Sequence, residues 1–99
     1  MKHTFHPEAL RELSEAVDHY KFISPELVAD FYLEMERLIH EVCLNSQLFR
    51  QFDPPARRHF SNRFPYGVIY LAEPDRVWIV AIMPLRREPA SWKQRVEKS

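Results

Sequence analysis

Two stretches in the first half of the chain repeat apolar residues at the spacing of an amphipathic helix. The first starts at Pro7-Glu8, where proline suits the first helical position because no N–H donor is needed there. Acidic residues fill the positions between its apolar residues, which are Leu10, Leu13, Val17 and Tyr20. This pattern predicts an amphipathic helix of about four turns.

The second stretch begins at Ser24-Pro25-Glu26, which combines a serine N-cap, a proline at the first position and an acid in the first turn. Its apolar stripe consists of Val28, Phe31, Met35, Leu38 and Val42. We expect this helix to end near Asn45-Ser46. The short link between the two helices predicts an antiparallel hairpin with a shared apolar face.

In the second half the apolar positions change to a period of two. Phe60, Asn62 and Phe64 alternate with their neighbours, and residues 66–71 and 76–83 are rich in β-branched and aromatic side chains. Glu73-Pro74-Asp75 predicts the turn between these last two strands, and residues 46–56 are predicted to be a loop. The unbroken apolar run 77–83 indicates a central strand, covered on both faces or on one face and by a partner.

With a short strand from Lys2 to His6, the predicted order is β-α-α-β-β-β. The fold class is therefore α+β: an N-terminal strand and a two-helix hairpin packed on a small antiparallel sheet. Ninety-nine residues leave room for one hydrophobic core, so residues 1–99 are expected to form a single domain. The tail after Pro84 is too polar for the core, although it carries Trp92.

Composition excludes several functional classes. The single cysteine, Cys43, lies on the apolar stripe of a helix, where it is expected to be a core residue, and it can form no internal disulfide. The single glycine, Gly67, excludes a glycine-rich phosphate-binding loop. We expect no cofactor and no metal. The run 77–83 is far shorter than the roughly 20 residues that span a bilayer, and no signal segment is evident, so a cytoplasmic protein is expected.

The net charge of zero hides an asymmetry between the two halves. Residues 1–55 carry 5 Lys/Arg against 10 Asp/Glu, and residues 56–99 carry 9 against 4, which gives −5 and +5. A basic second half suits an acidic macromolecular partner. The alternative is that the two halves face each other within the fold.

The candidate binding residues lie in this basic half. A guanidinium is a planar donor that fits a phosphate or carboxylate, and aromatic rings beside it can stack on a ligand. The candidates are Arg57, Arg58, Arg63, Tyr66, Arg86, Arg87, Trp92 and Arg95. His59 is the acid/base candidate because an imidazole titrates near neutral pH and arginines surround it in the sequence. The alternative is that His59 is a polar residue of an edge strand.

Two segments resemble the RelE/ParE superfamily of toxins from bacterial type II toxin–antitoxin modules. They are RFPYGVIY at residues 63–70 and RREPASWKQR at residues 86–95, separated by the apolar strand. The resemblance extends over nearly the whole predicted element order. It implies an acidic antitoxin that wraps around the basic half of the toxin, with DNA gyrase or ribosome-bound mRNA as the target. A homodimer remains open.

The same resemblance distinguishes two mechanisms. RelE-like members cleave mRNA, whereas ParE-like members poison gyrase. Arg86 or Arg87 matches the basic position after the last strand, but Gly67 stands where RelE-like nucleases tend to carry arginine, and Trp92 stands near their C-terminal tyrosine. These departures favour the ParE-like branch of plasmid-stabilisation toxins. Two alternatives stay open: a nuclease using His59, Arg63, Arg86 and Arg87, with Tyr70 as a further candidate, and a non-toxic binding module.

Overall fold

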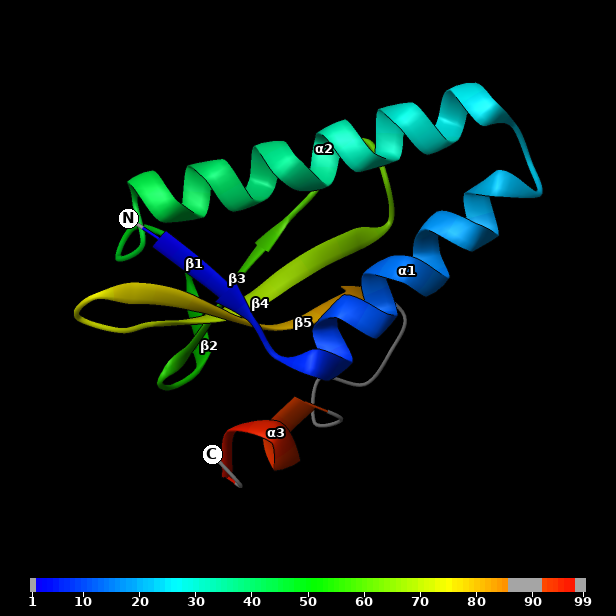
Figure 1. The fold of residues 1–99 in the computed structure, drawn as a ribbon. Coiled ribbons are helices and arrows are strands. Elements are labelled where there is room, and N and C mark those ends of the chain that lie inside the picture. The colour runs from blue at the N-terminus through cyan, green and yellow to red at the C-terminus, as the bar shows by residue number, and fades with distance from the viewer. Residues whose placement is uncertain (1, 86–91, 98–99) are drawn as a thin grey trace.

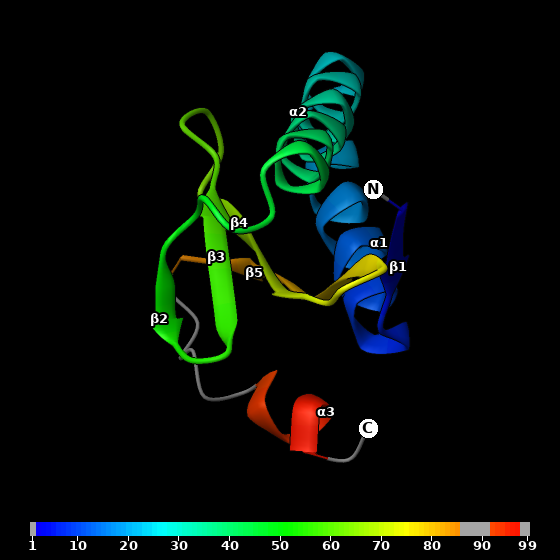
Figure 2. The ribbon, with the colours of Figure 1, turned by 90° about the vertical axis from the view of Figure 1, so that its left-hand side faces the viewer.

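The computed structural model describes residues 2–85 and 92–97. Five strands form one sheet, α1 and α2 cover one of its faces, and α3 lies against the other (Figures 1 and 2). The elements are β1 (Lys2–Phe5), α1 (Pro7–Lys21), α2 (Pro25–Leu44), β2 (Gln51–Asp53), β3 (Ala56–Phe60), β4 (Tyr66–Ala72), β5 (Arg76–Pro84) and α3 (Lys93–Glu97). The predicted α+β arrangement of an N-terminal strand, a helical hairpin and a small sheet is confirmed.

The strand order is β1-β5-β4-β3-β2, and three details differ from the expectation. The alternation of Phe60, Asn62 and Phe64 predicted a strand there, but β3 ends at Phe60 and residues 61–65 form the loop to β4. The sheet is mixed, because β1 runs parallel to β5 with Phe5 opposite Ile79, while the other pairs are antiparallel. Local pattern cannot reveal this pairing, since the whole helical hairpin separates the two strands. In addition, residues 51–53 of the predicted loop form β2, which is too short to show a periodicity of its own.

Both long helices start where the sequence predicts, and each has a capping side chain; the Ser24 cap was predicted, whereas the His6 cap was not. The Ser24 hydroxyl accepts hydrogen bonds from the backbone N–H groups of Glu26 and Leu27, at 3.2 and 3.4 Å, and Pro25 follows it at the first position. At α1, the Nδ1 of His6 accepts from the N–H of Glu8 at 3.0 Å. Each cap satisfies donors that lack a partner inside the helix. These caps fix where the hairpin begins and turns.

The apolar stripe of α2 is buried as predicted, but the stripe of α1 is displaced by one position. Phe31, Met35, Leu38 and Val42 of α2 lie in the main core. In α1 the buried residues are Ala9, Glu12, Ala16 and Tyr20, whereas Leu10 remains 51% exposed. The small alanines let α1 approach β5 closely. Its larger side chains, Leu10 and Leu13, are thereby turned toward the space between the helices.

A second apolar cluster covers the opposite face of the sheet. Ile69, Val80, Ala81 and Met83 lie there, and the indole of Trp92, only 3% exposed, covers them. Strand β5 is therefore covered on both faces, as its unbroken apolar run predicted. Trp92 belongs to this second core rather than to the polar tail.

A buried ion pair closes the edge of β5 beyond the end of β1. Residues after Ile79 have no partner strand on that side among the described residues. There the carboxylate of Glu12 accepts from the N–H of Ile82 at 3.2 Å, and the guanidinium of Arg95 donates to the carbonyl of Val80 at 2.9 Å. Glu12 and Arg95 also bind each other through two hydrogen bonds, at 2.7 and 2.9 Å. One polar group from α1 and one from α3 thus replace a missing strand.

We expect Arg95→Ala to destabilise the fold strongly. It leaves a buried carboxylate and a backbone carbonyl without their cation, so the free energy of unfolding should fall by about 3 kcal/mol in urea denaturation. Arg11→Ala is the matched control, because Arg11 pairs with Glu8 and Glu15 on the exposed face of α1. Equal losses for the two variants would contradict the structural role of the buried pair.

Candidate functional site

Arg57 holds the segment that follows α2. Its guanidinium donates to the carbonyl oxygens of Gln47 and Phe49, at 3.1 and 2.8 Å, and to the Gln47 side chain at 3.0 Å. These three bonds occupy donors that a phosphate would need. In this conformation Arg57 therefore fixes the loop that leads into β2.

His59 lies on the helix-facing side of β3 and is engaged with α2. Its Nε2 is 2.8 Å from a carboxylate oxygen of Glu41, and its ring stacks on Phe49 with centroids 3.9 Å apart. The hydrogen bond with His59 lowers the pKa of Glu41. His59 is therefore a polar residue that joins a strand to a helix. The alternative interpretation placed it on an edge strand, but β3 lies between β4 and β2.

Arg63 is the most exposed of the described candidates. It lies in the β3–β4 loop, 3.3 Å from a carboxylate oxygen of Asp30, and its guanidinium is 5.6 Å from the Phe64 ring centroid. An ion pair at this distance on the surface is weak, so Arg63 can exchange Asp30 for another anion. Arg63 is therefore accessible to an acidic ligand, and it stays a candidate binding residue as in the sequence analysis.

The loop that carries Arg63 is anchored by a buried polar cluster. The Ser61 hydroxyl donates to the carboxylate of Glu34 at 2.5 Å and accepts from the N–H groups of Arg63 and Phe64, at 3.0 and 3.1 Å. Arg37 binds the same carboxylate through two bonds, at 2.7 and 2.9 Å. Arg37, helped by Ser61, lowers the pKa of Glu34 to about 2 in spite of its burial.

The other two candidates on the sheet lie on opposite faces. Alternation along β3 turns Arg58 away from α2, and its guanidinium lies 5.0 Å from the Phe60 ring centroid. Tyr66 is half-buried on the helix side, where its ring contacts Tyr20 and Phe31. Arg58 and Tyr66 therefore do not form one continuous surface.

The four candidates of the tail divide into two groups. Arg86 and Arg87 lie outside the described residues. Trp92 and Arg95 have structural positions: the indole covers the second face of the sheet, and the guanidinium is held by Glu12 and Val80. The expectation that Trp92 stacks on a partner disagrees with its burial. The sequence could not distinguish the two roles, because a tryptophan in a polar tail suits both.

Tyr70 is also removed from the surface. Its ring is fully buried in the main core, and its hydroxyl donates to the carbonyl of Ser46 at 2.9 Å. Burial raises the pKa of this phenol to about 12. The hydroxyl is therefore a poor proton donor at neutral pH and helps to fix the loop after α2.

Part of the charge asymmetry is compensated within the molecule. Two ion pairs join the acidic first half to the basic second half, Glu12–Arg95 at 2.7 Å and Asp30–Arg63 at 3.3 Å, and the Glu41–His59 contact at 2.8 Å also links the two halves. For these residues the second interpretation of the charge pattern holds, in which the two halves face each other.

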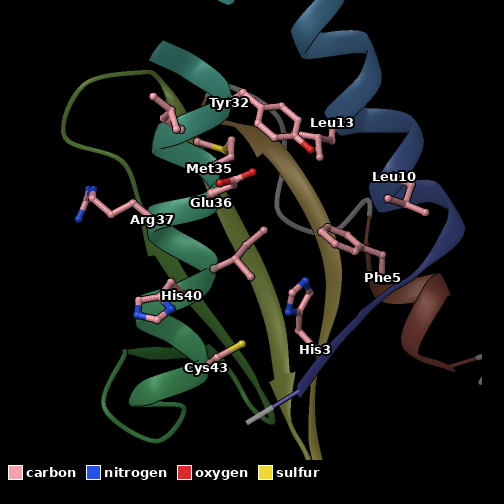
Figure 3. A pocket seen from close by; sticks show the side chains of 12 residues that line it. His3, Phe5, Leu10, Leu13, Tyr32, Met35, Glu36, Arg37, His40 and Cys43 are labelled. Atoms are coloured by element: carbon pink, nitrogen blue, oxygen red, sulfur yellow. The ribbon is translucent and has the colours of Figure 1, made fainter. Parts of the chain in front are cut away.

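An open groove of about 700 Å³ lies between α1, α2 and β1. The two helices meet at residues 22–24 and diverge toward β1, so their layer is incomplete there (Figure 1). Figure 3 shows the side chains of the three elements around this space. The groove is lined by His3, Phe5, Leu10, Leu13, Tyr32, Leu33, Met35, Glu36, Arg37, Ile39, His40 and Cys43.

The groove exposes large apolar side chains beside the main core. Besides Leu10, Tyr32 is 48% and Leu33 is 63% exposed, while Met35 and Ile39 form its floor. Exposed apolar residues that gather in one concave place mark a binding surface. Sequence reasoning missed this groove, because it assigned Leu10 to the buried stripe of the first helix. The available signal was Leu33, an apolar residue outside the predicted stripe of the second helix. Desolvation raises the pKa of Cys43 at the groove, which keeps the thiol protonated.

Two classes of site are not found among residues 2–85 and 92–97. These residues contain no cluster of three or more His, Cys, Asp or Glu side chains able to hold a metal ion. Within the same residues, no helix has the length and apolar character needed to cross a bilayer.

The fold has a counterpart among solved structures. A chain described as "Chromosomal ParDE TA system from P. aeruginosa" superposes with a TM-score of 0.72 and 19% sequence identity, over 85% of this chain and 95% of that chain. The chain has a RelE/ParE-type fold. The resemblance seen in the sequence is thereby confirmed at the level of the fold. No family model matches the sequence, and no match is found among curated proteins.

Within this RelE/ParE-type fold, Gly67 is required by the ring opposite it. Gly67 pairs with Phe60 across β3 and β4, and a Cβ at position 67 would lie 1.9 Å from Cδ1 of Phe60. No side chain fits there while Phe60 keeps its place. An arginine at this position would therefore require the ring of Phe60 to move.

We expect the ionisation of Glu34 to make the free energy of unfolding depend on pH in the acidic range. The pKa of Glu34 is about 2 in the fold and near 4.5 in the unfolded chain, so its contribution is complete above about pH 4.5 and is lost as the pH falls toward 2. Glu34→Gln should cost roughly 3 kcal/mol at pH 7 and flatten the loss of stability in this window, measured by urea denaturation at stepped pH. Glu36→Gln, on the exposed side of α2, should retain the acid dependence of the parent.

Proposed function

We propose that this single-domain chain is the toxin of a type II toxin–antitoxin module of the plasmid-stabilisation kind. It acts in the cytoplasm, binds a cognate acidic antitoxin and inhibits growth through a macromolecular target. The observation that carries the proposal is the fold shared with a chain of a ParDE toxin–antitoxin system. The open apolar groove supports it independently, because a free toxin has a surface that its antitoxin covers.

The groove suits an amphipathic helix of the antitoxin. The stretch of α2 that lines it, from Tyr32 to Cys43, is about 16 Å long at 1.5 Å per residue, which corresponds to three turns of a docked helix. Such a helix would complete the layer that α1 and α2 leave open above β1. Its apolar face would contact Met35 and Ile39, as in other helix-in-groove complexes.

For the target, DNA gyrase is favoured over RNA. Cleavage of RNA needs a proton acceptor or donor beside the cation that binds the phosphate. His59 is bound to Glu41, Tyr70 is buried, and Arg63 lies in a separate loop with Asp30. A nuclease remains the second candidate because Arg63 is exposed and can bind a phosphate. It would combine Arg63 and His59 with Arg86 and Arg87; a binding module without toxicity is the third.

Induction of the chain alone should arrest growth in the manner of a gyrase poison. We expect DNA breaks and filamentation with intact cellular RNA, measured by plating, microscopy and RNA gels. His59→Gln, which removes the acid/base group but keeps a hydrogen-bond donor, should be equally toxic. Cleaved RNA that disappears in His59→Gln would instead support the nuclease, and undisturbed growth would support the non-toxic module.

Leu33→Glu should free the toxin from its antitoxin. A carboxylate in the apolar groove opposes docking of an apolar helix, so co-expression of the antitoxin should no longer rescue growth. Leu44→Glu is the matched control, because Leu44 is 65% exposed on the same helix and does not line the groove. Equal rescue of the two variants would contradict the groove as the antitoxin site.

A further inference from the structure

The link between α1 and α2 exposes two adjacent apolar side chains. Phe22 is 94% exposed and Ile23 is 57% exposed, and the link projects beyond the sheet (Figure 1). The end of α1 is satisfied by backbone groups alone, because the carbonyl of Tyr20 accepts from the N–H groups of Ile23 and Ser24, both at 3.0 Å. Neither the core nor the helix end therefore uses the ring of Phe22.

Arg63 lies at the same end of the molecule. The ring of Phe64, its neighbour in the chain, packs on the rings of Tyr20 and Phe31, with centroids 5.2 and 5.3 Å apart. These contacts hold the β3–β4 loop against the end of α1 and the beginning of α2. An exposed aromatic ring, an exposed aliphatic side chain and an exposed guanidinium thus lie at one end. We call Phe22, Ile23 and Arg63 the hairpin-end surface.

The charges beside this surface favour a protein ligand over a nucleic acid. Asp18 and Glu26 lie within one turn of the link, and Asp30 contacts Arg63. These three acids against the two cations Lys21 and Arg63 leave a formal charge of −1. A phosphate backbone is bound by a surplus of cations, which this end lacks. Aromatic and arginine side chains, in turn, contribute most of the affinity in many protein–protein interfaces.

We propose that the hairpin-end surface binds the protein target of the toxin, with Phe22 and Ile23 in an apolar pocket and Arg63 on a carboxylate beside it. This inference rests on the proposed function and names the part of the chain that contacts the target. Burial of a ring that is 94% exposed in the free protein removes nearly all of its apolar surface from water. Arg63 exchanges Asp30 for the carboxylate of the target, because their exposed ion pair is weak.

The hairpin-end surface is separate from the groove assigned to the antitoxin. The groove is lined by neither Phe22, Ile23 nor Arg63. It opens where the helices diverge toward β1, whereas the surface lies where they meet (Figure 1). Substitutions at the hairpin end should therefore weaken target binding without weakening antitoxin binding.

The test compares Phe22→Ser with Leu48→Ser. Leu48 is 72% exposed and does not line the groove, so both variants should retain the thermal unfolding of the parent and its calorimetric affinity for the antitoxin. Growth arrest is measured at graded inducer concentrations, and supercoiling by purified DNA gyrase is measured at graded concentrations of each protein. We expect Phe22→Ser to need at least tenfold more protein than Leu48→Ser for equal inhibition.

Arg63→Ala and Arg50→Ala form a second matched pair, because Arg50 is an exposed arginine in the loop before β2. We expect a severalfold weaker effect for Arg63→Ala only. Equal growth arrest by Phe22→Ser and Leu48→Ser overturns the assignment of the surface, whether or not gyrase is the target, and leaves the toxin proposal in place. If the parent neither arrests growth nor inhibits gyrase, the proposed function fails and this inference fails with it.

Two other ligands of the hairpin-end surface have distinct signatures. Weaker binding of single-stranded RNA by Phe22→Ser than by Leu48→Ser, measured by fluorescence anisotropy, assigns the surface to nucleic acid. A dimer of the parent that Phe22→Ser dissociates in analytical ultracentrifugation assigns the surface to a second copy of the chain. Either result overturns the proposal.

Discussion

The fold depends on how the backbone groups of β5 find hydrogen-bond partners beyond the end of β1. Pro7 starts α1 directly after β1, so the sheet cannot continue on that side, and the backbone groups of Val80 and Ile82 would otherwise remain exposed. Glu12 and Arg95 bind these groups and each other. A buried carboxylate is tolerated only when paired and hydrogen-bonded, so α1, β5 and α3 must be in place together.

Three further acidic residues also link α2 to the rest of the fold, although only Glu34 among them is buried. Glu34, Glu41 and Asp30 of α2 face Ser61, His59 and Arg63 of the β3–β4 region. Each contact joins a helix to a strand or loop distant in sequence. His59 and Arg63, which the sequence suggested for a catalytic centre, therefore help to hold the helix against the sheet. What remains for a partner is the exposed Arg63 and the surfaces that the fold leaves uncovered.

Those uncovered surfaces lie together at one side of the molecule. The helices diverge above β1, which opens the groove, and β1 itself has an unpaired edge (Figure 2). The two have separate causes: two helices joined by a three-residue link diverge and leave part of the sheet face uncovered, and β1 is the first strand of an open sheet.

The sequence by itself determined the elements whose signals are local. Helical spacing, the Ser24 cap and Pro7 at a first helical position predicted both long helices, and the run 77–83 predicted the central strand covered on both faces. The order of these elements and two short motifs then pointed to the fold. Local signals sufficed here because capping and periodicity act over a few residues.

Only the tertiary structure decided which residues remain available to a ligand. Arg57, His59 and Arg95 have the chemistry of a binding site, but partners distant in sequence engage them, and Trp92 is buried under α3. Leu10 was predicted to lie in the buried stripe of the first helix and instead lines the groove, as does Leu33. The parallel pairing of β1 was likewise set by the hairpin between the strands. The physical reason is the same throughout: the use of a side chain depends on contacts across the sheet, which no local pattern encodes.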